Sequence, residues 1–218
     1  MTTKERIIDS ALTLFATKGY GDVYVGEIAD AVGIKAPSLY KHFKNKQEIF
    51  DAIIRTLSDR YTSQAANMGL NGTDATEDAG VYKDISEDSL VQMGQGLFLY
   101  FLHDDYMARF RKVLTLEQFN TPDLAALYTK QFYSDPITYQ AGMFDLLIQG
   151  GLLQGTDPEL MALEFYSPIY TLLTVCDRDP SYEKNAISLI EKHIRRFNQN
   201  HQNPKAGTRQ KNTKKGKA

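Results

Sequence analysis

The chain has 218 residues, a formal net charge of −2 and one cysteine, Cys176. This length allows one or two domains with a real core, and a lone cysteine excludes an intrachain disulfide and favours a reducing compartment, so we expect a cytoplasmic protein. No apolar run approaches the ~20 residues of a membrane span, and the N-terminus does not resemble a signal peptide, so we expect no membrane partner.

The first predicted helix lies between Thr2 and Gly19. Thr2 and Glu5 form a capping-box pattern, and apolar residues follow at helical spacing. Gly19 can adopt the positive φ that ends a helix. The pattern therefore predicts both ends of this helix.

Residues Val25–Phe43, VGEIADAVGIKAPSLYKHF, predict two short helices joined by a tight turn at Gly33. The first is Val25–Val32 and the second is Ala36–Phe43. The outward positions of the second helix carry donors and flat rings: Lys35, Ser38, Tyr40, Lys41 and His42. This is the layout of a helix-turn-helix, whose second helix enters the major groove of DNA. A polar helical hairpin at the surface is the alternative.

A further capping pattern, Asn45 with Glu48, follows and places Lys46 in the first turn of the next helix. A helix N-terminus beside an ammonium group suits a phosphate. The segments RIIDSALTLFATKGY, EIADAVGIKAPSLYKHF and KNKQEIF, within residues 6–50, together resemble the tetracycline-repressor (TetR) family of bacterial transcription regulators. The resemblance implies that double-stranded DNA is contacted by Lys35, Ala36, Pro37, Ser38, Tyr40, Lys41 and His42, and that Tyr40 and Lys46 bind phosphates.

Tyr24 departs from the family pattern, in which a Thr usually begins the second helix, caps it and touches a phosphate. A Tyr hydroxyl can still reach a phosphate, but it cannot cap a helix as Thr does. Tyr24 is therefore a candidate DNA contact without a capping role.

The charge is segregated along the chain. Residues 1–46 carry seven Lys or Arg and five Asp or Glu (+2), and residues 203–218 carry six Lys or Arg and no acid (+6), so residues 47–202 hold −10. An acidic body kept away from phosphates suits a protein that docks on DNA through its N-terminal part. We therefore expect a DNA-binding domain at 1–46, a ligand-binding and dimerisation domain at 47–202 and a disordered basic tail at 203–218, which is either a solvated terminus or an arm on DNA.

Residues 69–84, GLNGTDATEDAGVYKD, are expected to form a solvated connector. Helical patterns then predict five helices, at residues 86–103, 106–118, 122–150, 158–177 and 180–202. With four helices before the connector, the expected fold is all-α with nine helices, as the TetR resemblance implies. Asp135-Pro136 can either start a new helix or kink a long one.

Apolar stripes on the last two predicted helices suggest a homodimer interface. They comprise Phe165, Ile169, Leu172, Leu173, Ile187, Ile190, Ile194 and Phe197. Each stripe can also be ordinary core. Helix-turn-helix operators are typically two-fold symmetric, and a bundle with two helices from each subunit is what the resemblance implies.

The middle helices are rich in aromatic residues, which suggests a cavity for a small hydrophobic or cationic effector. The candidate lining residues are Phe98, Phe101, Phe119, Phe132, Tyr139, Phe144, Glu164, Tyr166 and Tyr170. Pro168 would free the carbonyl of Glu164 and bend the helix, so Glu164 either helps to bind a cation or faces solvent.

No catalytic, metal or cofactor site is expected. The His103-Asp104 pair occurs in some metal-dependent phosphohydrolases, but further ligands are missing nearby, and no phosphate loop or nucleophile elbow is present. The sequence therefore predicts a ligand-responsive repressor that releases a palindromic operator. The alternative is a dimeric DNA-binding adaptor whose C-terminal domain binds a protein.

Overall fold

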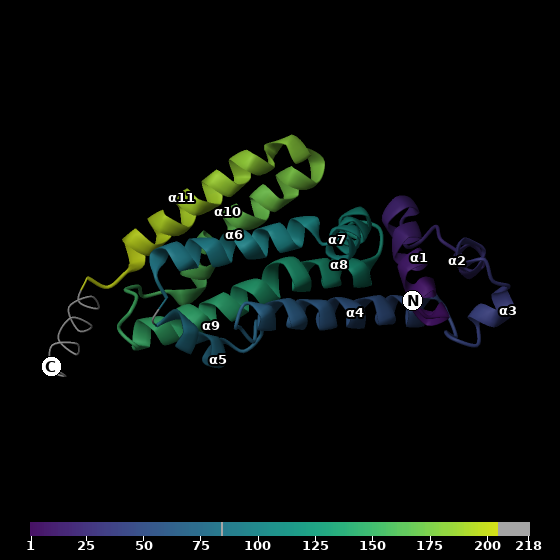
Figure 1. Cartoon of the computed structure of the whole chain (residues 1–218), viewed down its shortest axis with the longest axis horizontal. Helices are drawn as coiled ribbons and strands as arrows, with labels where there is room; N and C mark the ends of the chain where they lie inside the picture. Colours follow the sequence, from purple (N-terminus) through teal and green to yellow (C-terminus); the bar gives the residue numbers. More distant parts are fainter. Residues whose placement is uncertain (84, 205–218) are drawn as a thin grey trace. The chain divides into compact units, whose positions relative to one another are not determined.

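The computed structural model describes residues 1–83 and 85–204, and most of these residues are helical (Figure 1). Within these ranges there is one isolated antiparallel bridge, Leu153 with Gln202, and no strand. The expected all-α fold is confirmed. Of the predicted basic tail, residues 205–218 lie outside the described ranges. Among the described helices, none has the combination of length and hydropathy that spanning a membrane requires.

The helices of the described residues follow one another in this order. They are α1 (Thr3–Lys18), α2 (Val25–Val32), α3 (Ala36–Leu39), α4 (Lys46–Asn67), α5 (Ala75–Tyr82), α6 (Glu87–His103), α7 (Asp105–Glu117), α8 (Pro122–Thr129), the π-helical η1 (Lys130–Ser134), α9 (Asp135–Gln149), α10 (Pro158–Arg178), the 3₁₀-helical η2 (Pro180–Tyr182) and α11 (Glu183–His201). α8, η1 and α9 follow one another without a break, so Asp135-Pro136 begins α9 inside one continuous helical run.

One helix was not expected: α5 lies within the predicted connector. Its N-cap is Asp74, whose carboxylate accepts the amides of Thr76 at 2.8 Å and Glu77 at 3.3 Å. The buried Asp78 carboxylate accepts the amides of Asn71 and Gly72 and the hydroxyl of Tyr139. The polar composition of this segment thus reflects a capped helix and a buried hydrogen-bond centre, rather than a plain connector.

The chain divides into two compact units. Unit 1 comprises residues 1–64 and 103–131, and unit 2 comprises residues 65–102 and the chain from 132 onward. The core of unit 1 includes a run of ring contacts: Phe15 with Tyr20 and Tyr20 with Phe50, both at 5.1 Å, and Phe50 with Phe110 at 6.1 Å. These rings join α1, α4 and α7 behind the first helices of the chain.

Unit 2 contains two apolar clusters. One is centred on Val91, Phe98, Tyr170, Leu173, Ile190 and Ile194, and the other on Met143, Phe144, Leu147, Met161 and Phe197. Ile190 is 0% exposed and Ile194 is 1% exposed within the single chain, because α11 packs its apolar face on α6 and α10. Leu173 and Phe197 are buried as well, whereas Phe165, Ile169, Leu172 and Ile187 are half-buried, so four of the eight predicted interface residues are core within one chain.

Candidate nucleic-acid interface

The helix-turn-helix is held by the caps and apolar residues that the sequence predicts. Thr2 and Glu5 form the capping box of α1, and Gly19 ends that helix at φ 91°. Gly33 follows α2 at φ 75°, in the left-handed region that glycine adopts without strain. The amide of Ile34 donates to the Ala29 carbonyl at 3.0 Å, which turns the chain toward α3. Both turns therefore depend on glycine.

The second helix of the helix-turn-helix, predicted at Ala36–Phe43, begins at Ala36 as predicted, but its α-helical part is shorter. α3 ends at Leu39, and the following residues continue with tighter bonds, in which Lys41 donates to Ser38 and His42 to Leu39. Leu39 and Phe43 are 0% and 2% exposed, so the segment is anchored in the core at its middle and at its end. A 3₁₀-like turn is a common way to tighten the end of a helix.

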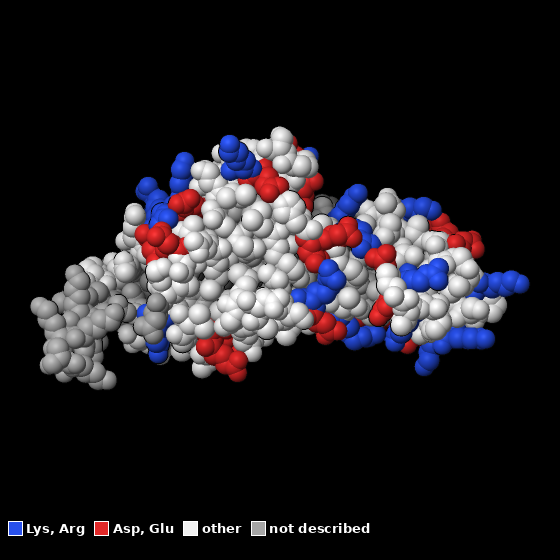
Figure 2. Space-filling view, viewed as in Figure 1, with Lys and Arg blue, Asp and Glu red and all other residues white. Residues whose placement is uncertain are grey.

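The outward side of this segment is open to solvent. Lys35, Pro37, Tyr40, Lys41 and His42 are exposed, and Ala36 and Ser38 are half-buried. Tyr40 is 53% exposed despite its apolar ring. Figure 2 shows Lys and Arg side chains projecting over α2 and α3. The segment thus combines two ammonium groups, an imidazole, a hydroxyl and a phenol on one accessible side.

Tyr24 begins α2 without capping it. Its side chain is 74% exposed and makes no capping hydrogen bond, whereas its amide donates to Glu27 Oε2 at 2.9 Å. The Glu27 carboxylate also accepts a hydrogen bond from Lys18 Nζ at 2.6 Å, and this bond lowers the pKa of Glu27. The phenol of Tyr24 therefore remains available to a partner at the start of α2.

Lys46, predicted as a phosphate ligand, is turned toward the protein. Its Nζ donates to the carbonyls of Tyr20 at 2.7 Å, Gly21 at 3.3 Å and Val23 at 3.0 Å, and lies 4.4 Å from the Tyr20 ring centroid. Burial lowers the pKa of Lys46, while the nearby carboxylates of Glu117 and Asp22 oppose that change. The ammonium thus stabilises the turn between α1 and α2 by hydrogen bonds to its carbonyls.

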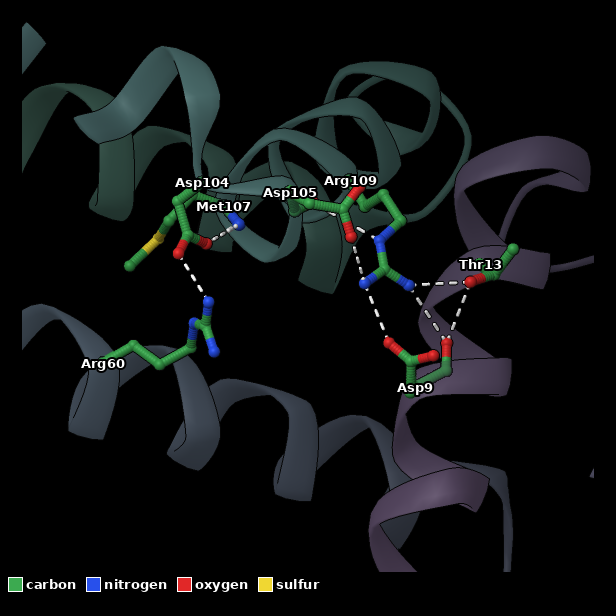
Figure 3. A network of polar contacts seen from close by, with 7 residues as sticks. All are labelled: Asp9, Thr13, Arg60, Asp104, Asp105, Met107 and Arg109. Carbon is green, nitrogen blue, oxygen red and sulfur yellow. Dashed lines mark hydrogen bonds and ion pairs between the residues drawn. The ribbon is translucent and has the colours of Figure 1, made fainter. Parts of the chain in front are cut away.

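A polar network joins α7 to α1 and α4 within unit 1 (Figure 3). Arg109 Nη2 lies 2.8 Å from Asp9 Oδ1 and 2.6 Å from Asp105 Oδ2. On the other side, Arg60 Nη2 lies 2.5 Å from Asp104 Oδ2, and Asp104 also caps α7 by accepting the amide of Met107. Asp104, from the predicted His103-Asp104 pair, therefore has a structural role.

The residues predicted to line an effector cavity fall into separate groups. Phe98, Phe101, Phe132, Tyr166 and Tyr170 belong to one apolar cluster of unit 2, where Tyr170 stacks on Phe132 at 5.6 Å and on Tyr166 at 5.9 Å. Tyr139 and Phe144 belong to the second cluster.

Two candidates belong to neither cluster. Phe119 is 90% exposed. It follows the end of α7 and lies within residues 103–131 of unit 1. The Glu164 side chain is 48% exposed and accepts from His201 Nε2 at 3.1 Å. Over residues 1–83 and 85–204, no group of three His, Cys, Asp or Glu side chains could hold a metal ion.

Glu117 is the site residue that the sequence did not single out. Its carboxylate accepts the Tyr20 amide at 2.7 Å and the Gly21 amide at 3.4 Å. The partners lie 97 and 96 positions away in the chain, and no local pattern indicates such a pairing.

Residues 7–53 match the family model of bacterial regulatory proteins of the tetR family. The chain is 38% identical over 76 residues to IcaR of Staphylococcus aureus strain Newman, a negative transcriptional regulator of the biofilm operon icaADBC. The alignment covers 35% of this chain and 40% of that relative, so less than half of the relative's length is matched.

Similarity to solved structures extends over most of the chain. A TetR-family regulator from Mesorhizobium loti matches with a TM-score of 0.65 and 19% identity, covering 92% of this chain and 96% of that chain. The complex of SmeT with triclosan matches with a TM-score of 0.66 and 18% identity, covering 94% of each chain; SmeT is a multidrug efflux repressor of Stenotrophomonas maltophilia. Residues 7–53 therefore carry the N-terminal domain described for bacterial regulatory proteins of the tetR family, and the chain shares the fold of these solved structures.

Proposed function

We propose that the protein is a homodimeric repressor that binds a two-fold symmetric operator and leaves it when a small molecule binds unit 2. One observation carries the DNA-binding part of this proposal: the donor-rich side of residues 35–42 is exposed, while its apolar side is buried through Leu39 and Phe43. A short helical segment of this kind fits the major groove, where base edges offer acceptors to such donors.

The proposed DNA contacts divide into two groups. Lys35, Ala36, Pro37, Ser38 and His42 face the bases, and Tyr24, Tyr40 and Lys41 reach phosphates. Phosphate contacts set the register of the protein on the duplex, and base contacts set the preferred sequence. Residues 1–46 supply these contacts, while residues 47–202 supply dimerisation and the effector site.

The proposed dimer interface uses the outer side of α10 instead of the buried stripes. Leu160 and Leu163 are 60% and 46% exposed, although both are large aliphatic residues. Ser167 and Thr171 continue the same side at helical spacing, and small residues allow a second helix to approach closely. A second copy of the chain would cover Leu160 and Leu163 without disturbing the core.

The proposed effector is a flat, mainly apolar molecule that inserts between Phe98, Phe101, Phe132, Tyr166 and Tyr170. Stacked rings favour such a molecule through offset ring contacts, and phenol groups can orient it. The triclosan complex of SmeT, which has the same fold, makes a halogenated phenol a reasonable first probe.

The adaptor alternative keeps one supporting observation. Leu116 and Phe119, at the end of α7, are 44% and 90% exposed. An exposed apolar pair can bind another protein. A partner that is captured by the wild type and lost with Phe119→Ser would favour the adaptor.

The proposed function is tested by selecting bound duplexes from a random library and then titrating the recovered duplex with protein. We expect one two-fold symmetric sequence, a complex with two protein chains, and release of the duplex by a subset of flat aromatic molecules. Recovery of unrelated sequences would contradict operator recognition. Binding that no tested aromatic molecule weakens would contradict only the proposed effector class.

A further inference from the structure

The turn between α1 and α2 is held by two side chains, one from α7 and one from α4. Its amides are taken by Glu117, since those of Tyr20 and Gly21 donate to Oε1 at 2.7 and 3.4 Å. Lys46 Nζ donates hydrogen bonds to the carbonyls of the turn, those of Tyr20, Gly21 and Val23. The turn therefore forms hydrogen bonds with both a carboxylate on α7 and an ammonium on α4.

Glu117 is built into this position. It is 4% exposed, and its second oxygen accepts the hydroxyl of Thr121 at 2.8 Å. A buried carboxylate that receives hydrogen bonds on both oxygens is costly to disturb, because each donor that leaves exposes part of the charge to an apolar surrounding. A Cβ atom at Gly19 would lie only 2.8 Å from Glu117 Oε1, so the turn approaches the carboxylate too closely for a side chain there.

Lys46 has no hydrogen-bond donor left for a phosphate. An ammonium group has three N–H donors, and three carbonyl oxygens surround this one at 2.7, 3.0 and 3.3 Å. The ring of Tyr20 lies against the same ammonium, and the Tyr20 hydroxyl donates to Gln47 Oε1 at 3.1 Å. The side chain is thus directed toward the turn by neighbours on both α4 and the turn itself.

We propose that Lys46 and Glu117 are positioning residues that jointly fix the turn before α2, and that Lys46 does not bind a phosphate. Val23, whose carbonyl Lys46 holds, directly precedes Tyr24 at the start of α2. A displacement of the turn therefore moves the whole α2–α3 pair relative to α4 and α7. This inference rests on the proposed DNA binding only for its consequence, because the hold by both side chains exists without DNA.

The salt dependence of DNA binding separates positioning from phosphate contact. Losing one phosphate contact lowers the slope of log K against log salt by about 0.9 per subunit, whereas a misplaced α2–α3 pair lowers affinity with little change in slope. The probe is the duplex recovered from the random library, titrated at several salt concentrations with the wild type, Lys46→Ala, Lys46→Arg and Lys41→Ala. Lys41→Ala is the comparison for a phosphate contact, because Lys41 is exposed beside α3.

We expect Lys46→Ala to weaken binding by about tenfold or more with an unchanged slope. Lys46→Arg should weaken binding as well, because a planar guanidinium cannot direct its donors to the same three carbonyls. A phosphate contact predicts the opposite result for Arg, which would keep both affinity and slope. The proposal would be overturned if the slope of log K against log salt fell by about 0.9 per subunit in Lys46→Ala while Lys46→Arg bound DNA like the wild type.

Hydrogen exchange tests the hold in the absence of DNA. In Glu117→Gln one oxygen of the charged acceptor is replaced by an amide nitrogen, so the Tyr20 and Gly21 amides should exchange at least about tenfold faster at constant pH. Thr121→Val removes only the third donor and should leave these two amides protected. Unchanged exchange in Glu117→Gln would overturn the hold itself, even if the wild type binds DNA. A wild type that binds no duplex, with faster exchange in Glu117→Gln, would overturn the DNA-binding proposal and leave the hold standing.

Discussion

The Arg109 side chain binds both the carboxylate and the main-chain carbonyl of Asp9. Nη2 lies 2.8 Å from Asp9 Oδ1, and Nη1 donates to the Asp9 carbonyl at 3.2 Å and to Thr13 Oγ1 at 2.7 Å. The guanidinium presents these donors in a fixed plane, which an ammonium cannot imitate. One side chain of α7 therefore fixes the rotation of α1 and its position along its own axis within unit 1.

Arg109→Lys should lower the free energy of unfolding by about 1 kcal/mol, because Lys keeps the charge near Asp9 but loses the bonds to the main chain and to Thr13. Asp9→Asn should cost less, since the Asp9 side chain is 45% exposed and solvent screens the ion pair. Urea unfolding followed by circular dichroism measures both. Asp105→Asn is the matched control, because the Asp105 side chain is 78% exposed. Equal losses for Arg109→Lys and Asp9→Asn would contradict the main-chain contribution.

Asp104 gives a prediction for acid pH. Burial alone would raise the pKa of Asp104, but the hydrogen bonds from Arg60 and the Met107 amide outweigh it and hold the pKa below its ordinary value of 3.8. A lowered pKa in the folded state adds stability that is complete above the unfolded pKa and is lost as the pH falls through the folded pKa. The melting temperature of Asp104→Asn should therefore lie below that of the wild type at neutral pH and approach it below pH 3.8. Asn can still cap α7. A difference that stays constant down to strongly acid pH would contradict this role of the charge.

Gly94 and Ile194 mark the close approach of α6 and α11. A Cβ atom at Gly94 would lie 2.4 Å from Ile194 Cδ1, and Ile194 is 1% exposed, so its side chain has little room to turn away. Overpacking of this kind costs about 1–3 kcal/mol, against which a helical Gly→Ala change gains about 1 kcal/mol. Ile194→Val removes the clashing methyl group.

The double variant Gly94→Ala/Ile194→Val should therefore be more stable than the sum of the two single changes predicts, by about 1 kcal/mol or more. Chemical unfolding of the wild type and the three variants gives this coupling directly. Additive changes would show that Ile194 is not the group that limits space at Gly94.

A carboxylate should have different effects at a buried aliphatic position of α11 and at an exposed aliphatic position of α10. Ile190→Glu places a carboxylate in a core position that is 0% exposed, so it should unfold unit 2 or destabilise it by several kcal/mol. Leu163→Glu lies on the exposed side of α10, so it should leave folding intact and give monomers in sedimentation. Leu116→Glu, at 44% exposure on α7, is the matched control and should remain a dimer. A dimeric Leu163→Glu protein would exclude the proposed interface.

Local patterns predicted the local structure well. The capping box of Thr2 and Glu5, the bond from the Glu48 amide to Asn45, and the turns at Gly19 and Gly33 all occur as expected. Each of these features depends on residues within a few positions of one another. The predicted bounds of α2 also match, and α4 begins at Lys46, which the sequence places in the first turn of that helix.

Long-range packing is what the sequence could not supply. An apolar stripe such as that of Ile190 and Ile194 looks the same whether a neighbouring helix or a second subunit covers it. The direction of the Lys46 ammonium depends on a turn that folds back from more than 20 residues earlier, at separations of 23 to 26 positions. The pairing of Glu117 with the same turn spans nearly half of the chain, so no periodicity reveals it.

We propose that residues 35–42 read a DNA sequence. The most direct measurement is the ratio of two affinities at one salt concentration, for the selected duplex and for a scrambled duplex of the same length. Shared phosphate contacts cancel in this ratio, so it reports base recognition. A specific regulator should give a ratio of about a thousand or more for the wild type, and replacing Ser38 and His42 by Ala should reduce it while leaving the affinity for the scrambled duplex nearly unchanged. A wild-type ratio near one would contradict sequence-specific recognition.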